Sequence, residues 1–296
     1  MSDGERRASG PPAARDDTEP ADGRFDPRAI RGVTFDFGDT LVVVRREDFR
    51  AVVAGMAADA CAHLRLGDPD AFLGAWGEER DRQMAEDVAD GREMDLGRRV
   101  ARTVARLRGV APPPPDRPWD DAEVDAVVDA PEVDWTLARY RDRWVAGIPA
   151  DPGVARLLER HASHRRLGIL SNWPHAATLR AQVDAAGWTP WLSAIVVSSE
   201  VGAIKPAAAM FRAAESALGW PGAPAGSILH VGDDRRADIA GARRAGWRAA
   251  WLHRDNPGSP LPGAGREPGP EDPAPDIEID ALEELLHILA EPPTAG

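Results

Sequence analysis

The chain has 296 residues, a formal net charge of −13, 43% hydrophobic residues and a single cysteine, Cys61. This length can bury one large core or two modest ones. The acidic excess is strongest at the C-terminal end, where residues 251–296 carry ten acids and two bases. Nucleic acid and anionic membranes, which bind basic surfaces, are therefore not expected partners. One cysteine allows no intrachain disulfide, and neither a membrane span nor a secretory signal is apparent, so we expect a cytoplasmic protein.

The first half of the chain predicts a tail, one strand and a group of helices. Residues 1–29 are rich in Pro, Gly, Asp and Arg, and predict a disordered tail. An apolar, β-branched run at residues 31–36 predicts the first strand. Helical periodicity then continues over residues 46–146, which predicts a small helical cap domain; its helices are expected at residues 51–64, 69–86, 96–107 and 121–145. In the third of these helices the arginines are expected on the face opposite the apolar residues.

The second half alternates short apolar strands with helical segments. The predicted strands lie at residues 167–170, 194–197, 227–231, 248–252 and 276–279. This alternation predicts an α/β fold with a Rossmann-like parallel sheet covered by helices, built from residues 30–45 and 147–290. Residues 255–275 contain many Pro and Gly residues and predict a flexible loop within this core.

The first predicted strand runs directly into the segment Asp36-Phe37-Gly38-Asp39-Thr40. A carboxylate that follows a buried strand lies at the carboxyl edge of the sheet, where ligands bind in open α/β folds. There Asp36 can serve as a nucleophile, a metal ligand or both. A strand followed by an Asx-type turn is the simpler structural alternative.

Three later segments also place polar residues next to predicted strands and helices. Ser171 and Asn172 follow a strand, and Lys205 precedes a proline that begins a helix. Asp233 ends another strand, and Asp238 follows five residues later. Such carboxylates repel one another unless a cation lies between them, and oxygen ligands favour Mg²⁺. Taken singly, these features also fit a turn, a solvated lysine and a helix-capping acid.

Together and in this order, the four segments resemble the haloacid dehalogenase-like hydrolase superfamily over residues 30–290. The helical insertion resembles the small C1-type cap of that superfamily. The resemblance implies that Asp36 is the nucleophile that forms an aspartyl-phosphate. It also implies that Ser171, Asn172 and Lys205 bind the phosphoryl group and that Lys205 steadies the nucleophile.

The same resemblance implies a bound Mg²⁺ and assigns its ligands. These are the carboxylates of Asp36, Asp233 and Asp238 and the main-chain carbonyl of Gly38. The implied substrate is a small phosphorylated molecule. The sequence carries no indication of an oligomeric state.

One position departs from the commonest pattern of the superfamily, Asp-x-Asp-x-Thr. Its second aspartate protonates the leaving group, whereas this chain has Gly38 there and an acid one place later, Asp39. Neighbouring residues on extended backbone point in opposite directions, so Asp39 does not simply replace that acid. General acid–base help contributes about 10²–10⁴ in rate, or roughly 3–5 kcal/mol of barrier. Three accounts remain open: Asp39 reaches the leaving group through a distorted turn, a cap residue or water serves instead, or the substrate has a good leaving group.

The sequence therefore predicts a Mg²⁺-dependent phosphatase, with Asp36, Ser171, Lys205 and Asp39 as catalytic candidates. Two alternatives remain. A 2-haloacid-dehalogenase-like hydrolase also lacks the second acid, but that branch needs no metal and does not keep the acidic fourth segment. A phosphoryl-binding regulatory protein with little turnover is supported only by Gly38.

Overall fold

The computed structural model of the chain describes residues 24–115, 117–254, 256–262 and 269–293. Six strands form one parallel sheet in the order β3-β2-β1-β4-β5-β6. The predicted parallel α/β core is therefore confirmed. The predicted disordered tail lies outside the described residues up to residue 23. The strands are β1 (Gly32–Phe35), β2 (Arg166–Ser171), β3 (Ala194–Val197), β4 (Ile228–Gly232), β5 (Arg248–Leu252) and β6 (Ile277–Ile279).

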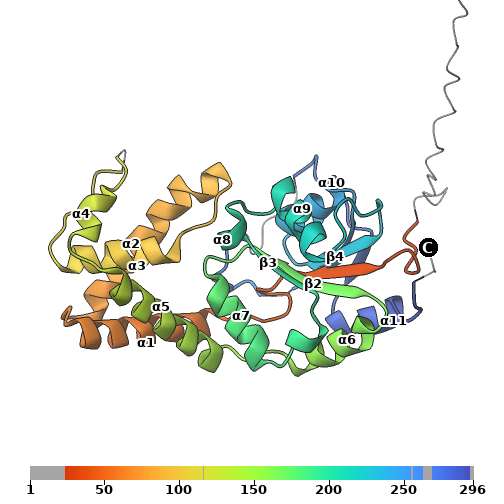
Figure 1. Cartoon of the computed structure of the whole chain (residues 1–296), viewed down its shortest axis with the longest axis horizontal. Helices are drawn as coiled ribbons and strands as arrows, with labels where there is room; N and C mark the ends of the chain where they lie inside the picture. Colours follow the sequence, from red (N-terminus) through yellow and green to blue (C-terminus); the bar gives the residue numbers. More distant parts are fainter. Residues whose placement is uncertain (1–23, 116, 255, 263–268, 294–296) are drawn as a thin grey trace, which may run out of the picture.

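Helices cover both faces of this sheet, which is why its strands are apolar runs with little alternation (Figure 1). One face packs against α9 (Ala208–Ala217) and α10 (Gly241–Arg244). The other face packs against α6 (Pro152–Ala162), α7 (Ala176–Ala185) and α11 (Leu285–Ile288). The short helix α8 (Ser198–Val201) follows β3 directly. No helix among the described residues is long and apolar enough to cross a bilayer.

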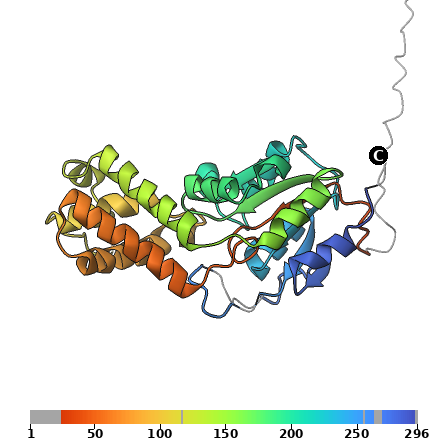
Figure 2. The same ribbon diagram turned by 90° about the horizontal axis from the view of Figure 1, so that it is seen from below.

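Residues 46–147, here called the cap, form a separate group of helices beside the sheet (Figure 2). The helical segment predicted over residues 121–145 is divided near Pro131 into two helices, because Asp129 and Glu132 form a capping box that begins a new helix with Pro131 in its first turn. The cap helices are α1 (Arg46–Leu64), α2 (Pro69–Glu86), α3 (Leu96–Leu107), α4 (Asp121–Asp125) and α5 (Ala130–Gly147).

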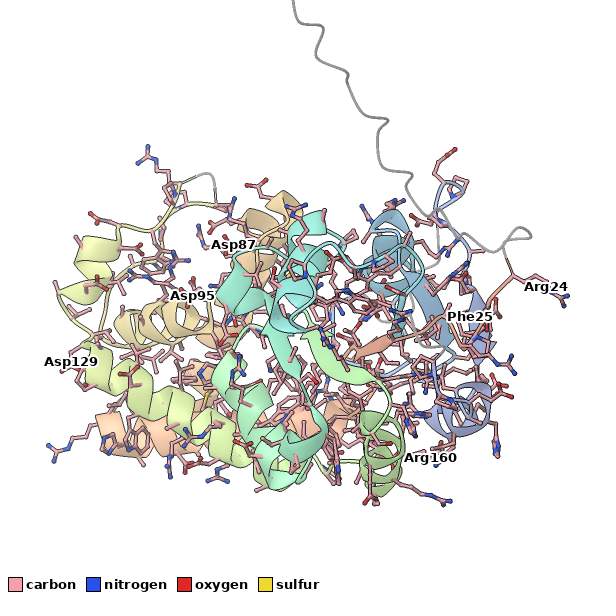
Figure 3. All side chains as sticks on the ribbon, turned by 45° about the vertical axis from the view of Figure 1, so that its right-hand side comes forward. Arg24, Phe25, Asp87, Asp95, Asp129 and Arg160 are labelled. Atoms are coloured by element: carbon pink, nitrogen blue, oxygen red, sulfur yellow. The ribbon has the colours of Figure 1, made fainter. Side chains whose placement is uncertain are left out.

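The carboxyl edge of the sheet faces the cap. Cap residues Asp87, Asp95 and Asp129 lie at one end of the molecule, whereas Arg24 and Phe25, which lead into β1, lie at the other (Figure 3). In the strand register, Phe35 is level with Ile169 of β2 and Val231 of β4. The residues that follow these three strands therefore meet at one edge, at the point where the strand order reverses.

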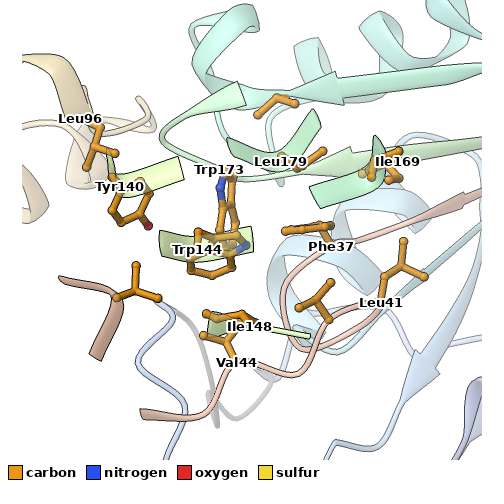
Figure 4. Packing of buried hydrophobic residues seen from close by; sticks show 14 of the residues in the cluster. Phe37, Leu41, Val44, Leu96, Tyr140, Trp144, Ile148, Ile169, Trp173 and Leu179 are labelled. Atoms are coloured by element: carbon orange, nitrogen blue, oxygen red, sulfur yellow. The ribbon is translucent and has the colours of Figure 1, made fainter. Parts of the chain in front are cut away.

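Aromatic side chains join the cap to the core. Trp144, near the end of α5, is fully buried and meets Trp173, just after β2, edge to face with ring centroids 4.9 Å apart. Trp173 makes a second edge contact with Phe37, at 5.1 Å. Figure 4 shows Trp173 next to Trp144, with Phe37 on the core side and Tyr140 on the cap side. Burying three large rings in contact ties the orientation of α5 to the turn after β1.

Replacing Trp144 by alanine is expected to lower the free energy of unfolding by about 3–5 kcal/mol. The substitution leaves a cavity between the cap and the core, and neither of these two packed units can move far enough to fill it. Chemical denaturation measures this loss. The matched control is Trp135→Ala, since Trp135 is only half-buried and stacks on His63 at the cap surface. A cost for Trp144→Ala no larger than that of Trp135→Ala would contradict this view of the junction.

Candidate active site

The ammonium group of Lys205 is the centre of the site. It donates to Asp36 Oδ1 at 2.7 Å, to Asp238 Oδ1 at 2.6 Å and to the main-chain oxygen of Leu170 at 2.7 Å. All three of its hydrogens are therefore used, and the residue is only 2% exposed. Burial alone would lower the pKa of Lys205, but the charges of Asp238 and Asp36 raise it above its usual value. The lysine is a permanent cation at the end of β2.

Asp36 comes directly after β1, and its amide bonds to the Val231 oxygen of β4 at 2.8 Å. Burial raises the pKa of its carboxyl to about 6, and the nearby charge of Lys205 opposes this rise. The carboxyl is therefore ionised at neutral pH. A partly desolvated carboxylate held by one lysine keeps a free oxygen for a reaction or for a metal.

Asp238 is held tightly from several sides. Its Oδ1 accepts from Lys205 and faces His230 Nε2 at 3.2 Å, and its Oδ2 accepts from the Asp234 amide at 3.0 Å. Burial would raise the pKa of Asp238, but Lys205 and His230 hold it well below its usual range. A side chain at Gly232 would come within 2.2 Å of Asp238 Oδ2. Glycine at the end of β4 is therefore what leaves room for this carboxylate.

Asp233 lies across from Asp36 and has no cation beside it. Its Oδ1 accepts from Thr40 Oγ1 at 3.0 Å. Burial, together with repulsion from Asp238 and Asp36, raises the pKa of Asp233 well above its usual value. Oxygen atoms of Asp36, Asp233 and Asp238 all lie within 4.8 Å of one another. Three carboxylates with one lysine leave two negative charges when all are ionised, and such an all-oxygen set fits a hard divalent cation.

Ser171 and Asn172 have different surroundings. The Ser171 hydroxyl, at the end of β2, is buried close to the Asp36 carboxylate, where it acts to lower the pKa of that group, and it makes no firm hydrogen bond among the described residues. The amide of Asn172 bonds to the backbone of Lys205 at both ends, accepting from its N–H at 2.7 Å and donating to its oxygen at 3.1 Å. Ser171 thus has a donor to offer to a ligand, whereas Asn172 positions the lysine.

The turn after Asp36 leaves no space for a side chain at position 38. A Cβ on Gly38 would come within 2.5 Å of Leu261 and within 3.1 Å of Trp173. Leu261 belongs to residues 256–262, the described part of the loop that the sequence predicts to be flexible. These residues pack against the site, so the loop contributes to its wall.

Asp39 does not share the direction of Asp36. Its backbone is in the left-handed region, with φ of 56°, and its carboxylate is 2% exposed. Oδ1 accepts from the Val44 amide and from Asn256 Nδ2, both at 2.9 Å. Oδ2 accepts from the Ser259 hydroxyl. These bonds fasten loop 256–262 onto the turn after β1.

A cavity of about 170 Å³ lies between this sheet edge and the cap. Its lining includes every candidate site residue except Ser171, together with cap residues that were not predicted from the sequence, namely Trp76, Arg80, Glu93, Arg99 and Tyr140. Glu93 bridges the two units, because it accepts from the Ser198 hydroxyl of the core at 2.6 Å. Its pKa is raised by burial.

The sequence analysis also missed residues that support the turn. Thr40 could have been found from the Gly-Asp-Thr segment, which places a hydroxyl shortly after the first acid. Arg254 donates to the main-chain oxygens of Asp39 and Thr40 at 2.7 and 3.0 Å. Nothing in the local sequence around Arg254 signals this contact.

Comparisons with known proteins agree with this geometry. Residues 30–246 match the family model of haloacid dehalogenase-like hydrolases. A pyrimidine 5'-nucleotidase of Escherichia coli is 30% identical over 141 residues, which cover 47% of this chain and 56% of that protein. A phosphoserine phosphatase of Thermus thermophilus is 34% identical over 107 residues, 36% of this chain and 38% of that protein. The matched segments thus cover little more than half, or less, of these relatives.

Solved structures share the fold over nearly their whole length. A 2-haloacid dehalogenase from Pseudomonas syringae has a TM-score of 0.61 at 24% identity, covering 88% of this chain and 98% of that one. A magnesium-bound hydrolase from Bacillus subtilis has a TM-score of 0.55 at 21% identity, with the same coverage. The family model covers well over half of the chain and includes all four candidate segments. This protein therefore belongs to the haloacid dehalogenase-like hydrolase family.

Proposed function

We propose that the protein is a Mg²⁺-dependent phosphatase that acts on a small phosphorylated metabolite. The observation that carries this proposal is the convergence of three carboxylates and one lysine at one sheet edge, beside a buried hydroxyl that makes no firm hydrogen bond. A phosphate ester brings negative charge to a carboxylate nucleophile, so such a site needs fixed positive charge. The curated relatives named above are a nucleotidase and a phosphatase, which supports the same class of substrate.

Each residue has a distinct part in the proposed reaction. An Asp36 carboxylate oxygen attacks phosphorus, the bond from phosphorus to the ester oxygen breaks, and the departing alcohol takes up a proton. Water then attacks the phosphorus of the aspartyl-phosphate, which releases inorganic phosphate and regenerates Asp36. Lys205 holds Asp36 in place and offsets its charge, and the Ser171 hydroxyl donates to a phosphoryl oxygen.

Asp36, Asp233 and Asp238 supply oxygen donors for the metal, with the Gly38 carbonyl as a further main-chain ligand. Bound Mg²⁺ supplies positive charge that stabilises negative oxygens of the transferring group. Thr40 orients Asp233 toward the cluster. Asp238, already bonded to Lys205 and His230, has less free capacity than the other two carboxylates.

We infer that Asp39 positions the loop and does not donate the proton. The three hydrogen bonds to its carboxylate come from Val44, Asn256 and Ser259, and Leu261 fills the space beside Gly38. The proton for the departing alcohol then comes from water or from a cap acid such as Glu93. Alternatively, the leaving group is stable enough to depart as an anion and needs no proton.

A 2-haloacid-dehalogenase activity is the second candidate, because the shared fold includes such enzymes and position 38 carries no acid. In that reaction Asp36 would attack carbon and expel halide. The cluster of Asp233 with Asp36 and Asp238 favours the phosphatase. Acids that repel one another are stabilised by a bound cation, and hydrolysis of a halocarboxylate does not require one.

The nucleophile is tested with an aryl phosphate and with chloroacetate. Asp36→Asn is expected to lower aryl phosphate turnover by roughly 10³ or more, as for other nucleophile deletions. Asp142→Asn, an exposed cap residue, is the matched control and should keep wild-type turnover. Chloride release from chloroacetate without phosphate release would replace the phosphatase by the dehalogenase. Absence of both activities across a broad substrate panel would favour a phosphoryl-binding protein.

Mg²⁺ is expected to stabilise the folded chain, because it binds the acid cluster only when the cluster is assembled. At a hundred times its dissociation constant the gain is about 2.7 kcal/mol, which thermal unfolding detects as a rise in Tm. Asp233→Asn should lose this rise while remaining at least as stable as the wild type without metal, since it removes a buried charge repelled by two others. An equal Mg²⁺ response in the variant would show that the metal binds elsewhere.

The role of Asp39 is tested by leaving-group dependence. A proton donor matters more for an alkyl phosphate, which leaves poorly, than for an aryl phosphate. Asp39→Asn is expected to change kcat for both substrates by the same factor, because a positioning residue acts on the site as a whole. A selective loss of about 10²–10⁴ on the alkyl phosphate would instead identify Asp39 as the general acid.

A further inference from the structure

Arg99 is a buried cation in the cap wall of the active-site cavity. Helical periodicity places the arginines of α3 on its exposed face, but Arg99 is only 5% exposed. It lines the same cavity as Asp36 and Lys205. A guanidinium in this position faces whatever part of a substrate lies farthest from the reacting phosphorus.

The partners of Arg99 are all neutral. Its Nε donates to Gln83 Oε1 at 3.0 Å, and Nη2 contacts the sulfur of Met94 at 3.1 Å. The guanidinium also lies 5.1 Å from the centre of the Trp76 ring. No carboxylate of the described residues comes within 4.0 Å of it. Arg98, Arg102 and Arg106 of the same helix each have two carboxylate partners, drawn from Glu78, Glu79, Glu86, Asp121 and Asp125.

A buried charge that forms no ion pair is costly to fold. The charges of Glu93 and Asp81 act on Arg99 only from beyond salt-bridge distance, so its N–H groups on the cavity side stay open to an anion. Burial lowers the pKa of Arg99 to about 10, which still leaves it charged at neutral pH. Glu93, an acid on the same wall, is held by the Ser198 hydroxyl and the Met94 amide instead. Arg80 also lines the cavity, but its guanidinium is paired with Asp81, which leaves Arg99 as the cap cation open to a ligand. The cap half of the cavity therefore attracts an anion.

We propose that Arg99 binds a carboxylate of the substrate, so that the protein acts on phosphate monoesters of small hydroxycarboxylic acids. This rests on the phosphatase function proposed above. A guanidinium with unused N–H groups suits the two oxygens of a carboxylate. The single positive charge of Arg99 balances the single negative charge of a carboxylate. It would leave part of the charge of a second, doubly charged phosphate group unbalanced. The cavity of about 170 Å³ is smaller than the roughly 300–1,000 Å³ of pockets for larger ligands.

The test compares two esters of similar size, phosphoglycolate and ethyl phosphate, which differ by the carboxylate. Wild-type kcat/KM is expected to favour phosphoglycolate by at least about tenfold, the worth of a charged hydrogen bond. Arg99→Gln should bring this ratio close to one, and Arg99→Lys should keep part of it. Arg98→Gln is the matched control, since Arg98 precedes Arg99 on α3 and faces Asp121 and Asp125 at the surface; it should keep the wild-type ratio.

Two results would overturn the assignment: a wild-type enzyme without preference for phosphoglycolate, or an Arg99→Gln variant that loses both substrates equally. A structural role predicts the second result, because loss of the Gln83 and Trp76 contacts would disturb the cap for every substrate. Binding to the Asp36→Asn variant, measured by thermal shift with the same two esters, separates this inference from the reaction. If phosphoglycolate stabilises the Asp36→Asn variant more than ethyl phosphate does, but the wild type hydrolyses neither ester, the carboxylate site at Arg99 is supported and the phosphatase function is rejected.

Discussion

The site depends on one buried ammonium group. Lys205 has every hydrogen bonded to Asp36, Asp238 or a strand carbonyl, so it cannot turn away to satisfy another partner. It neutralises one of the three acids and fixes the direction of two of them. The lysine bonds only one oxygen of Asp36 and forms no ion pair with Asp233, so the remaining negative charge is concentrated between these two carboxylates. The same arrangement thus accounts for a carboxylate held in place and for a cluster that favours a divalent cation.

Much of the core half of this site could be predicted because its causes are local. Apolar runs identify the strands, and the carboxyl ends of parallel strands share one edge, so Asp36, Ser171 and Asp233 had to lie near one another. The surroundings of Arg99 could not be predicted in this way. Helical periodicity assigns a charged residue to the solvent face, and only the packing of α2 against α3 shows that Gln83 and Trp76 enclose it.

The described part of the loop near the C-terminus, residues 256–262, is held by contacts that its composition does not reveal. Prolines and glycines in residues 255–275 are typical of a flexible connection, yet Asn256 and Ser259 bond to Asp39, and Leu261 fills the space beside Gly38. The acid at position 39 and the missing side chain at position 38 are therefore two parts of one structure. Asp39 anchors the loop, and the anchored loop occupies the volume where a side chain at position 38 would lie.

The cap and the core are joined by contacts of different chemical character, one apolar and one polar. Trp144 and Trp173 form an apolar contact that is costly to break. On the loop that precedes α3, the connection consists of hydrogen bonds, from the Ser198 hydroxyl to Glu93 and from the Ile204 amide to the Gly91 oxygen. The donor of the first of these bonds is buried, because Ser198 has no exposed surface. Ile204 directly precedes Lys205 in the core, and Gly91 and Glu93 lie on the loop that leads into α3, the helix of Arg99. The polar contact therefore joins the segment that holds the lysine to the segment that leads to the cavity arginine, so a movement of the cap over a charged substrate would act on both.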